Sequence, residues 1–235
     1  MGNAAAKEAL ESAELGKCTL HVGGASSVDA GSVTTESPTK LKLKGSSFYY
    51  AGDGKRLMMK CRTEGMFGKR GSLVDGEGSV MAKIAIKSGL SADVVYVMRE
   101  GKPAYEGQEP IKAEDLKRMK EPEDSELYAF AKCEAKMGLT TANATYSIVT
   151  GTDGSGESTF EPMYVAQKLS AVKFMALVKT AKDEVPVAKA MMRGGFSTSV
   201  DFEVSEGVDM AAMFVCMLGA TPGGNAGALA GAGVI

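Results

Sequence analysis

The sequence predicts a mainly β fold, a closed antiparallel barrel of about ten to twelve strands around a hydrophobic helix near the C-terminus. From residue 48 onward, most segments alternate apolar and polar side chains with a period of two, and turn residues separate them. This pattern alone fits a sandwich or a closed barrel. Residues 210–218 are instead apolar on every side, so a helix there must be buried all round, and the inside of a barrel provides such a place. A last core strand, or a helix lying flat on a sheet, remains the alternative for this segment.

The two ends of the chain differ in composition from its middle. Residues 1–45 are rich in Ala, Ser, Thr and Gly, and we interpret them as a loosely structured extension with one short helix at residues 4–15. Residues 220–235 form a low-complexity tail of Ala and Gly. The barrel, including a central helix at residues 209–219, is therefore expected to span residues 46–219.

Three strands are clear in the first half of the barrel. In the first, Leu57, Met59 and Cys61 share one face, and a Gly-Asp-Gly turn precedes it. The second and third are residues 79–87 and residues 94–100, which also follow or precede turn sequences. Their alternation predicts one face toward a core and one toward solvent.

The second half begins after a charged connector. Residues 111–126 lack alternation, and we interpret them as a short helix stopped by Pro122 and followed by a link between the halves. Asp209 is expected to cap the final helix, and Gly219 with the Pro-Gly sequence behind it is expected to end that helix. The alternating segments between them are residues 126–136, 144–151, 171–179, 185–193 and 197–204.

The composition limits the chemistry that the chain can perform. A formal net charge of −2 provides no global basic field to attract nucleic acid. The single histidine, His21, lies in a Gly- and Ser-rich stretch, so a His-rich metal site is excluded and any Ser/His/Asp or Cys/His machinery would depend on this residue. We therefore expect no enzymatic activity, no catalytic residue, no cofactor and no metal.

Cysteine usage and hydropathy indicate the compartment. Cys18, Cys61, Cys133 and Cys216 lie far apart with no C-x-x-C pair, which favours reduced thiols in an intracellular protein. No apolar stretch approaches the ~20 residues of a spanning helix, and the N-terminus lacks the basic and apolar regions of a secretory signal. We expect an intracellular protein, not secreted, in the cytoplasm or peripheral on a membrane or large assembly.

Several segments together resemble a known family. They are DGKRLMMKCR, GSLVDGEGSVMAKIAIK and VVYVMREGK in the first half, and ATYSIVTG, AVKFMALVK through MMRGGF, and STSVDFEVSEGVDMAAMFVCML in the second. With these segments the chain is similar, over residues 48–218, to the LURP-one-related proteins of the tubby C-terminal-like superfamily, which is distantly related to the phospholipid scramblases. The resemblance implies a tubby-like barrel around a helix, and a binding or scaffold module rather than an enzyme.

The resemblance also implies a candidate anion site. Tubby-like barrels bind phosphoinositide headgroups through basic residues on a strand pair of the first half, which in this chain corresponds to Lys83 and Lys87, with Lys69 and Arg70 in the preceding hairpin. A multiply charged headgroup requires several cations fixed on one surface. The alternative is that lysines on an outward strand face only keep the barrel soluble.

Three functions follow as hypotheses. The first is a non-enzymatic interaction module, scaffold or adaptor that binds protein partners. The second is a peripheral structural subunit of a larger multi-protein complex, membrane-associated or not, with its termini strapped on neighbouring subunits. The third is a membrane tether that binds a phosphoinositide, an anionic lipid headgroup. None of the three involves nucleic acid or a transmembrane segment.

Overall fold

The computed structural model confirms the predicted fold class. It describes residues 3–19, 35, 37–44, 47–64, 70–88, 93–98, 129–134, 143–155, 158–170, 174–192 and 199–220. Within these residues, twelve strands pair antiparallel in sequence order, and β1 pairs with β12 to close the barrel. The strands are β1 (Thr39–Lys44), β2 (Ser47–Tyr50), β3 (Leu57–Glu64), β4 (Arg70–Asp75), β5 (Val80–Ser88), β6 (Asp93–Met98), β7 (Ala129–Glu134), β8 (Asn143–Thr152), β9 (Ser158–Lys168), β10 (Met175–Thr180), β11 (Pro186–Met192) and β12 (Val200–Val204).

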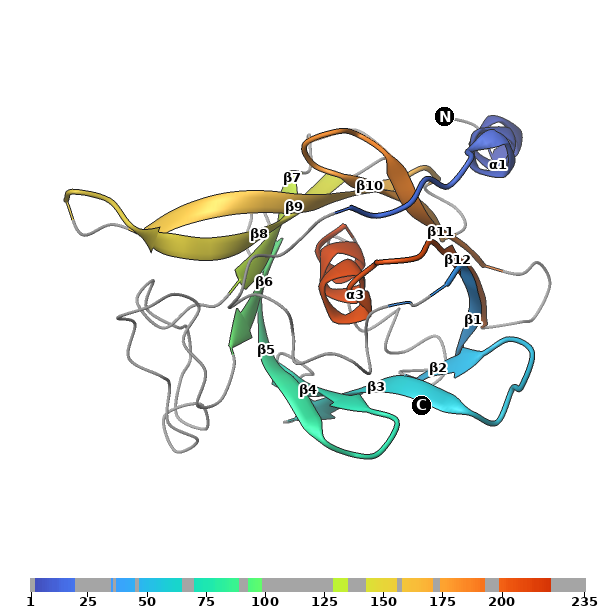
Figure 1. Ribbon diagram of the computed structural model, residues 1–235, viewed down its shortest axis with the longest axis horizontal. Coiled ribbons are helices and arrows are strands. Elements are labelled where there is room, and N and C mark those ends of the chain that lie inside the picture. The colour runs from blue at the N-terminus through green and yellow to red at the C-terminus, as the bar shows by residue number, and fades with distance from the viewer. Residues whose placement is uncertain are drawn as a thin grey trace.

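The C-terminal helix α3 (Met210–Gly219) lies inside the ring of strands (Figure 1). All ten of its residues are buried, as its all-round apolarity predicts. The ring of Phe214 meets the ring of Phe48, on β2, edge-on with 5.1 Å between centroids. At its end, Gly219 packs closely against the wall, because an added Cβ would lie 3.0 Å from the Cβ of Ala131. Because residues 210–219 form a helix inside the ring of strands, the alternatives of a last core strand and of a helix lying flat on a sheet are excluded.

Asp209 caps this helix, as its sequence predicts. Its carboxylate accepts hydrogen bonds from the backbone N–H groups of Ala211 at 2.9 Å and Ala212 at 3.0 Å. These groups would otherwise have no partner at the start of a buried helix. The cap therefore allows a helix without polar side chains to begin inside the barrel.

The N-terminal residues form structure that belongs to the barrel. Helix α1 (Asn3–Ser12) lies against the outside of the barrel wall beside β10 (Figure 1). Residues 13–19, which we call the strap, continue from it along the barrel end, and β1 begins at Thr39. The range predicted as a loose extension, residues 1–45, thus contains a docked helix and a barrel strand.

Some predicted features lie outside the described residues. These are the short helix within residues 111–126, the tail from residue 221 onward, and His21. Among the residues that the structure does describe, no helix is long and apolar enough to cross a membrane.

Candidate functional site

A buried polar cluster lies at the start of α3. The hydroxyl of Tyr164, on β9, accepts a hydrogen bond from the backbone N–H of Asp209 at 3.3 Å and lies 3.7 Å from the Sγ of Cys18, on the strap. Burial, together with the nearby Cys18 and Asp209, raises the pKa of the Tyr164 hydroxyl well above its usual value. A tyrosine held neutral in this way ties three chain segments together, which is a structural role.

Two barrel thiols are protonated at neutral pH. Burial raises the pKa of Cys61 to about 11 and that of Cys216 to about 12. The Cys216 Sγ also donates to the carbonyl of Ala144 at 3.3 Å. Because the thiolate is the reactive form of cysteine, these side chains pack as small hydrophobic groups rather than act as nucleophiles.

The described residues contain no group of three or more His, Cys, Asp or Glu side chains that could hold a metal ion. The lumen itself is occupied by α3. Three regions of the outer face of the barrel carry side chains that bear on binding.

The first region contains the predicted anion-binding residues. Lys83, half-buried on β5, pairs in register with Ser72 of β4, and its Nζ donates a hydrogen bond to the Ser72 hydroxyl at 2.8 Å. Arg70 of β4 pairs with Ala85, which lies two residues beyond Lys83 on β5, and Lys87 lies two residues further on the same strand. The structure thus brings the strand positions of Arg70, Lys83 and Lys87 together. Lys69 lies outside the described residues.

The second region is aromatic and was missed by the sequence reasoning. Phe130 alternates on β7 with the fully buried Ala129 and Ala131, so it lies on the outer face, where it pairs in register with Tyr96 of β6. Phe160, on β9, meets it edge-on with ring centroids 4.9 Å apart. We call Tyr96, Phe130 and Phe160 the outer aromatic surface.

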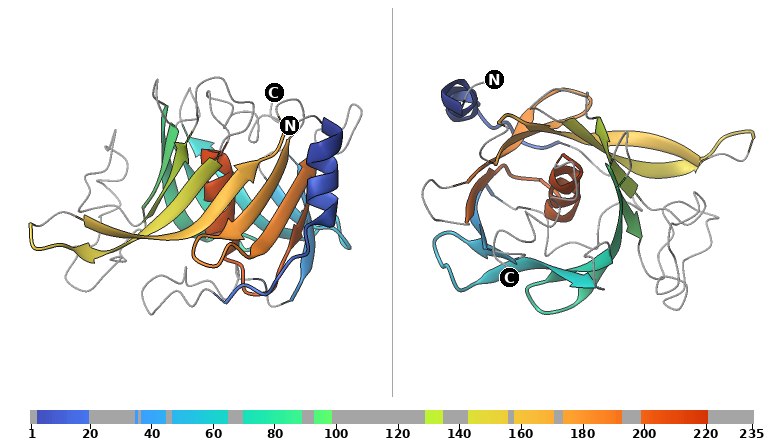
Figure 2. Two further views of the ribbon diagram at one scale, coloured as in Figure 1. Left: turned by 90° about the horizontal axis from the view of Figure 1, so that it is seen from above. Right: turned by 180° about the vertical axis from the view of Figure 1, so that it is seen from behind.

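Phe160 is the exposed end of this surface. It is 41% exposed, and it belongs to the β8–β9 hairpin, which extends beyond the barrel wall (Figure 2). Among the described residues only one other large hydrophobic side chain is exposed, Val80 at 50%, at the start of β5. Because aromatic residues are enriched at protein interfaces, this ring is a candidate contact residue.

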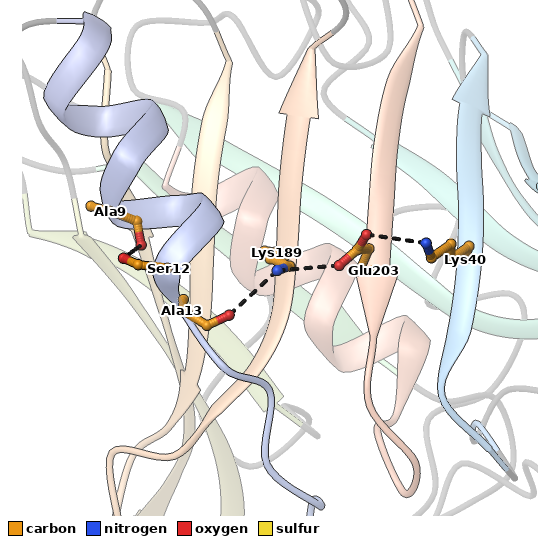
Figure 3. Close-up of polar contacts among 6 residues, drawn as sticks. All are labelled: Ala9, Ser12, Ala13, Lys40, Lys189 and Glu203. Atoms are coloured by element: carbon orange, nitrogen blue, oxygen red, sulfur yellow. Dashed lines mark hydrogen bonds and ion pairs between the residues drawn. The ribbon is translucent and has the colours of Figure 1, made fainter.

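The third region lies between α1 and the outer face of β10–β12 (Figure 3). Lys40 of β1, Glu203 of β12 and Lys189 of β11 follow one another across the strands, with Nζ–carboxylate distances of 3.6 Å for Lys40–Glu203 and 3.2 Å for Lys189–Glu203. The Nζ of Lys189 also donates to the backbone carbonyl of Ala13 at 3.3 Å. This ladder joins the barrel wall to the residue that follows α1.

The apolar contact between α1 and the barrel is small. Ala6 and Leu10 are buried against Leu169, Met175 and Leu177, with Ala13 and Met191 partly buried beside them. Burying one leucine and one alanine in this way contributes about 2–3 kcal/mol. Beside this contact lies a cavity of about 230 Å³, lined by Leu10, Glu11, Lys189, Ala190, Met191, Asp201 and Glu203.

Comparisons with known proteins concern the fold. No protein-family model matches the chain, and no curated protein matches it. Among solved structures, the X-ray structure of an Arabidopsis thaliana protein, AT5G01750, is similar, with 15% sequence identity and a TM-score of 0.45. The match covers 79% of this chain and 92% of that chain.

Proposed function

We propose that the protein is a non-enzymatic interaction module that binds protein partners on the outside of its barrel, as the resemblance to the LURP-one-related, tubby-like proteins implies. The observation that carries the proposal is the outer aromatic surface, in which exposed Phe160 stacks edge-on against Phe130 on a projecting hairpin. A ring in this position contributes a large apolar contact at low entropic cost.

The inside of the barrel supports the same proposal. Helix α3 lies in the lumen with all ten residues buried, and its capping groups and Tyr164 are hydrogen-bonded within the protein. The raised pKa values of Cys61 and Cys216 leave these thiols unreactive at neutral pH. Binding on the outer face therefore fits these residues better than catalysis inside the barrel.

The N-terminal segment favours the interaction module over the alternative of a subunit strapped on its neighbours. The described part of this segment binds its own barrel, through the backbone hydrogen bonds from Gly16 to Pro186 and from Cys18 to Glu206. Contacts of this kind do not require a neighbouring subunit.

The test is quantitative affinity capture from native cells followed by mass spectrometry. The wild-type chain is compared with Phe160→Ser and with the matched control Val80→Ser, which removes the other exposed hydrophobic side chain. We expect a set of proteins that the wild type and Val80→Ser capture in equal amounts. Phe160→Ser should capture about tenfold less of the same proteins, as for a residue that dominates an interface. The same proteins captured at the same level by all three chains would contradict the proposal.

A further inference from the structure

Helix α1 depends on the barrel for its stability. It has only ten residues, with no acidic side chain in its first turn and no basic side chain in its last turn, so nothing within it offsets the helix dipole. Helices of this length are marginal in water on their own. Its buried face consists of Ala6 and Leu10, four residues apart, with Ala13 partly buried.

The barrel supplies what α1 lacks. The floor under the helix is formed by Leu169, Met175 and Leu177. At its C-terminal end, the cation of Lys189 donates to the carbonyl of Ala13, and Glu203 holds that cation in place. A cation at this end offsets the dipole of any helix that lies in the same direction. We call Leu169, Met175, Leu177, Lys189 and Met191 the helix groove.

The strap is anchored independently of α1. The N–H of Gly16 donates to the carbonyl of Pro186 at 2.9 Å, and the N–H of Cys18 donates to the carbonyl of Glu206 at 3.0 Å. Lys17 and Glu206 add an ion pair at 2.7 Å. These anchors lie at residues 16–18 and involve no residue of α1, so they do not depend on α1 being in the groove.

The groove is also wider than α1 requires. A cavity of about 230 Å³ lies beside α1 and is lined by Leu10 and Glu11 of the helix and by residues of β11 and β12, among them Met191 and Glu203. A helix with a longer side chain beside its leucine would fill this space. Glu203 is already paired with Lys40 and Lys189, and Lys189 lines the same space, so a longer apolar side chain fits it better than a further cation.

We propose that the helix groove is a docking site for an amphipathic helix of a protein partner, and that α1 occupies it as an exchangeable cover. The partner helix carries a small residue and a leucine four positions apart, a longer apolar side chain beside that leucine, and its C-terminal end over Lys189. This inference rests on the proposed function and adds a second surface to it, together with the kind of partner.

The test uses the full-length chain and a fluorescein-labelled peptide of residues 3–14, whose binding is followed by fluorescence anisotropy. Leu10→Asp removes the apolar anchor of α1, while Ala5→Asp places the same charge on the exposed face of the helix as a matched control. We expect Leu10→Asp to bind the peptide at least about tenfold more tightly than wild type or Ala5→Asp. In the latter two chains α1 covers the groove, and the apparent affinity falls in proportion to the fraction of molecules whose groove is open.

Two further variants test the role of Lys189 in the Leu10→Asp background. Lys189→Met should weaken peptide binding by about fivefold or more, because the cation at the helix end is lost. Lys40→Met removes the cation that pairs with Glu203 from β1, while Lys189 still donates to Ala13, and it should leave peptide binding unchanged. Equal effects of the two substitutions would contradict the role assigned to Lys189.

Hydrogen exchange of the wild-type chain provides a test that needs no variant. The amides of residues 7–12 should exchange at least about tenfold faster than those of Gly16 and Cys18, because α1 opens while the strap stays bound. Equal exchange in the two segments, or no peptide binding to a folded Leu10→Asp chain, would overturn the inference. Either result would leave the outer aromatic surface and its capture experiment unaffected.

Discussion

The Sγ of Cys18 lies 3.7 Å from the hydroxyl of Tyr164, although 146 positions separate the two residues in the sequence. Cys18 belongs to the strap and Tyr164 to β9, so this contact brings the N-terminal segment to the place where α3 begins. The strap is therefore part of the packing at one end of the barrel. The first prediction concerns its fit.

Gly207 should not tolerate a side chain. Its φ of +82° is a left-handed conformation, and an added Cβ would lie 2.4 Å from the carbonyl oxygen of Cys18. We expect Gly207→Ala to lower the free energy of unfolding by about 1–3 kcal/mol in urea titrations. Gly52→Ala is the control, since nothing lies within 4 Å of its Cβ position, and it should change the stability little. Equal stabilities of the two variants would show that the strap does not fit as described.

Met213 should be essential for the core. It is fully buried on α3 inside the barrel. Met213→Ala should lower the free energy of unfolding by about 2–5 kcal/mol, and Met213→Asp should abolish soluble expression, because an unpaired buried charge costs several kcal/mol. Val80→Asp, at a side chain that is 50% exposed, should stay folded. An unchanged melting temperature of Met213→Asp would mean that α3 is not central to the fold.

Stability should decrease at alkaline pH, in part through Cys216. Burial raises the pKa of its thiol from 9.0 to about 12, so above pH 9 the unfolded chain releases a proton that the folded chain retains. The free energy of unfolding then falls by up to about 1.4 kcal/mol per pH unit for this group. Below pH 9 the thiol is protonated in both the folded and the unfolded chain, so it adds no pH dependence to the free energy of unfolding.

The measurement is a series of urea titrations between pH 8 and pH 11 on wild type and Cys216→Ala. The variant should show a shallower decrease in stability above pH 9. Because the slopes are compared, the cavity that the substitution leaves does not affect the result. Parallel curves would contradict the assignment of the alkaline loss to this thiol.

Binding to phosphoinositide vesicles should be weak or absent. Lys83 is half-buried and donates to Ser72, and a multiply charged headgroup requires several cations together. Vesicle co-sedimentation at low and high salt is the measurement, since each cation contributes only about 1 kcal/mol and is screened by salt. Salt-sensitive, tight binding that Lys83→Glu with Lys87→Glu removes, and that exposed Lys55→Glu with Lys182→Glu keeps, would instead favour the membrane tether.

The sequence predicted those elements whose pattern follows from burial alone. Helix α3 was predictable because apolarity on every side leaves no other position for it, and its cap at Asp209 follows a common pattern. Strand β1 was missed although Leu41 and Leu43 alternate with lysines, because it lies in a range whose composition resembles a flexible extension. A short alternation carries little weight against the composition of its surroundings.

Strand β9 was missed for a different reason. Pro162 interrupts it, and proline is expected to end a strand. In the barrel this residue lies where the register with β8 shifts, between Tyr146 and Ser147, and such a bulge accommodates proline. Because β9 carries Phe160, the outer aromatic surface was missed with it.

The helix groove was not predictable from local pattern. The alternation of β10 and β11 shows which residues face outward, but not that α1 covers them. The ladder of Lys40, Glu203 and Lys189 depends on register between strands far apart in the sequence. Register of this kind follows from the closed barrel as a whole.

Site-specific photocrosslinking tests the central claim, binding of protein partners on the outer face, most directly. A photoreactive phenylalanine analogue replaces Phe160 in one chain and Val80 in another, and both are expressed in native cells and irradiated. We predict a discrete crosslinked protein adduct from position 160 and none from position 80, since only Phe160 belongs to the outer aromatic surface. No adduct at position 160, or the same adducts from both positions, would contradict the claim.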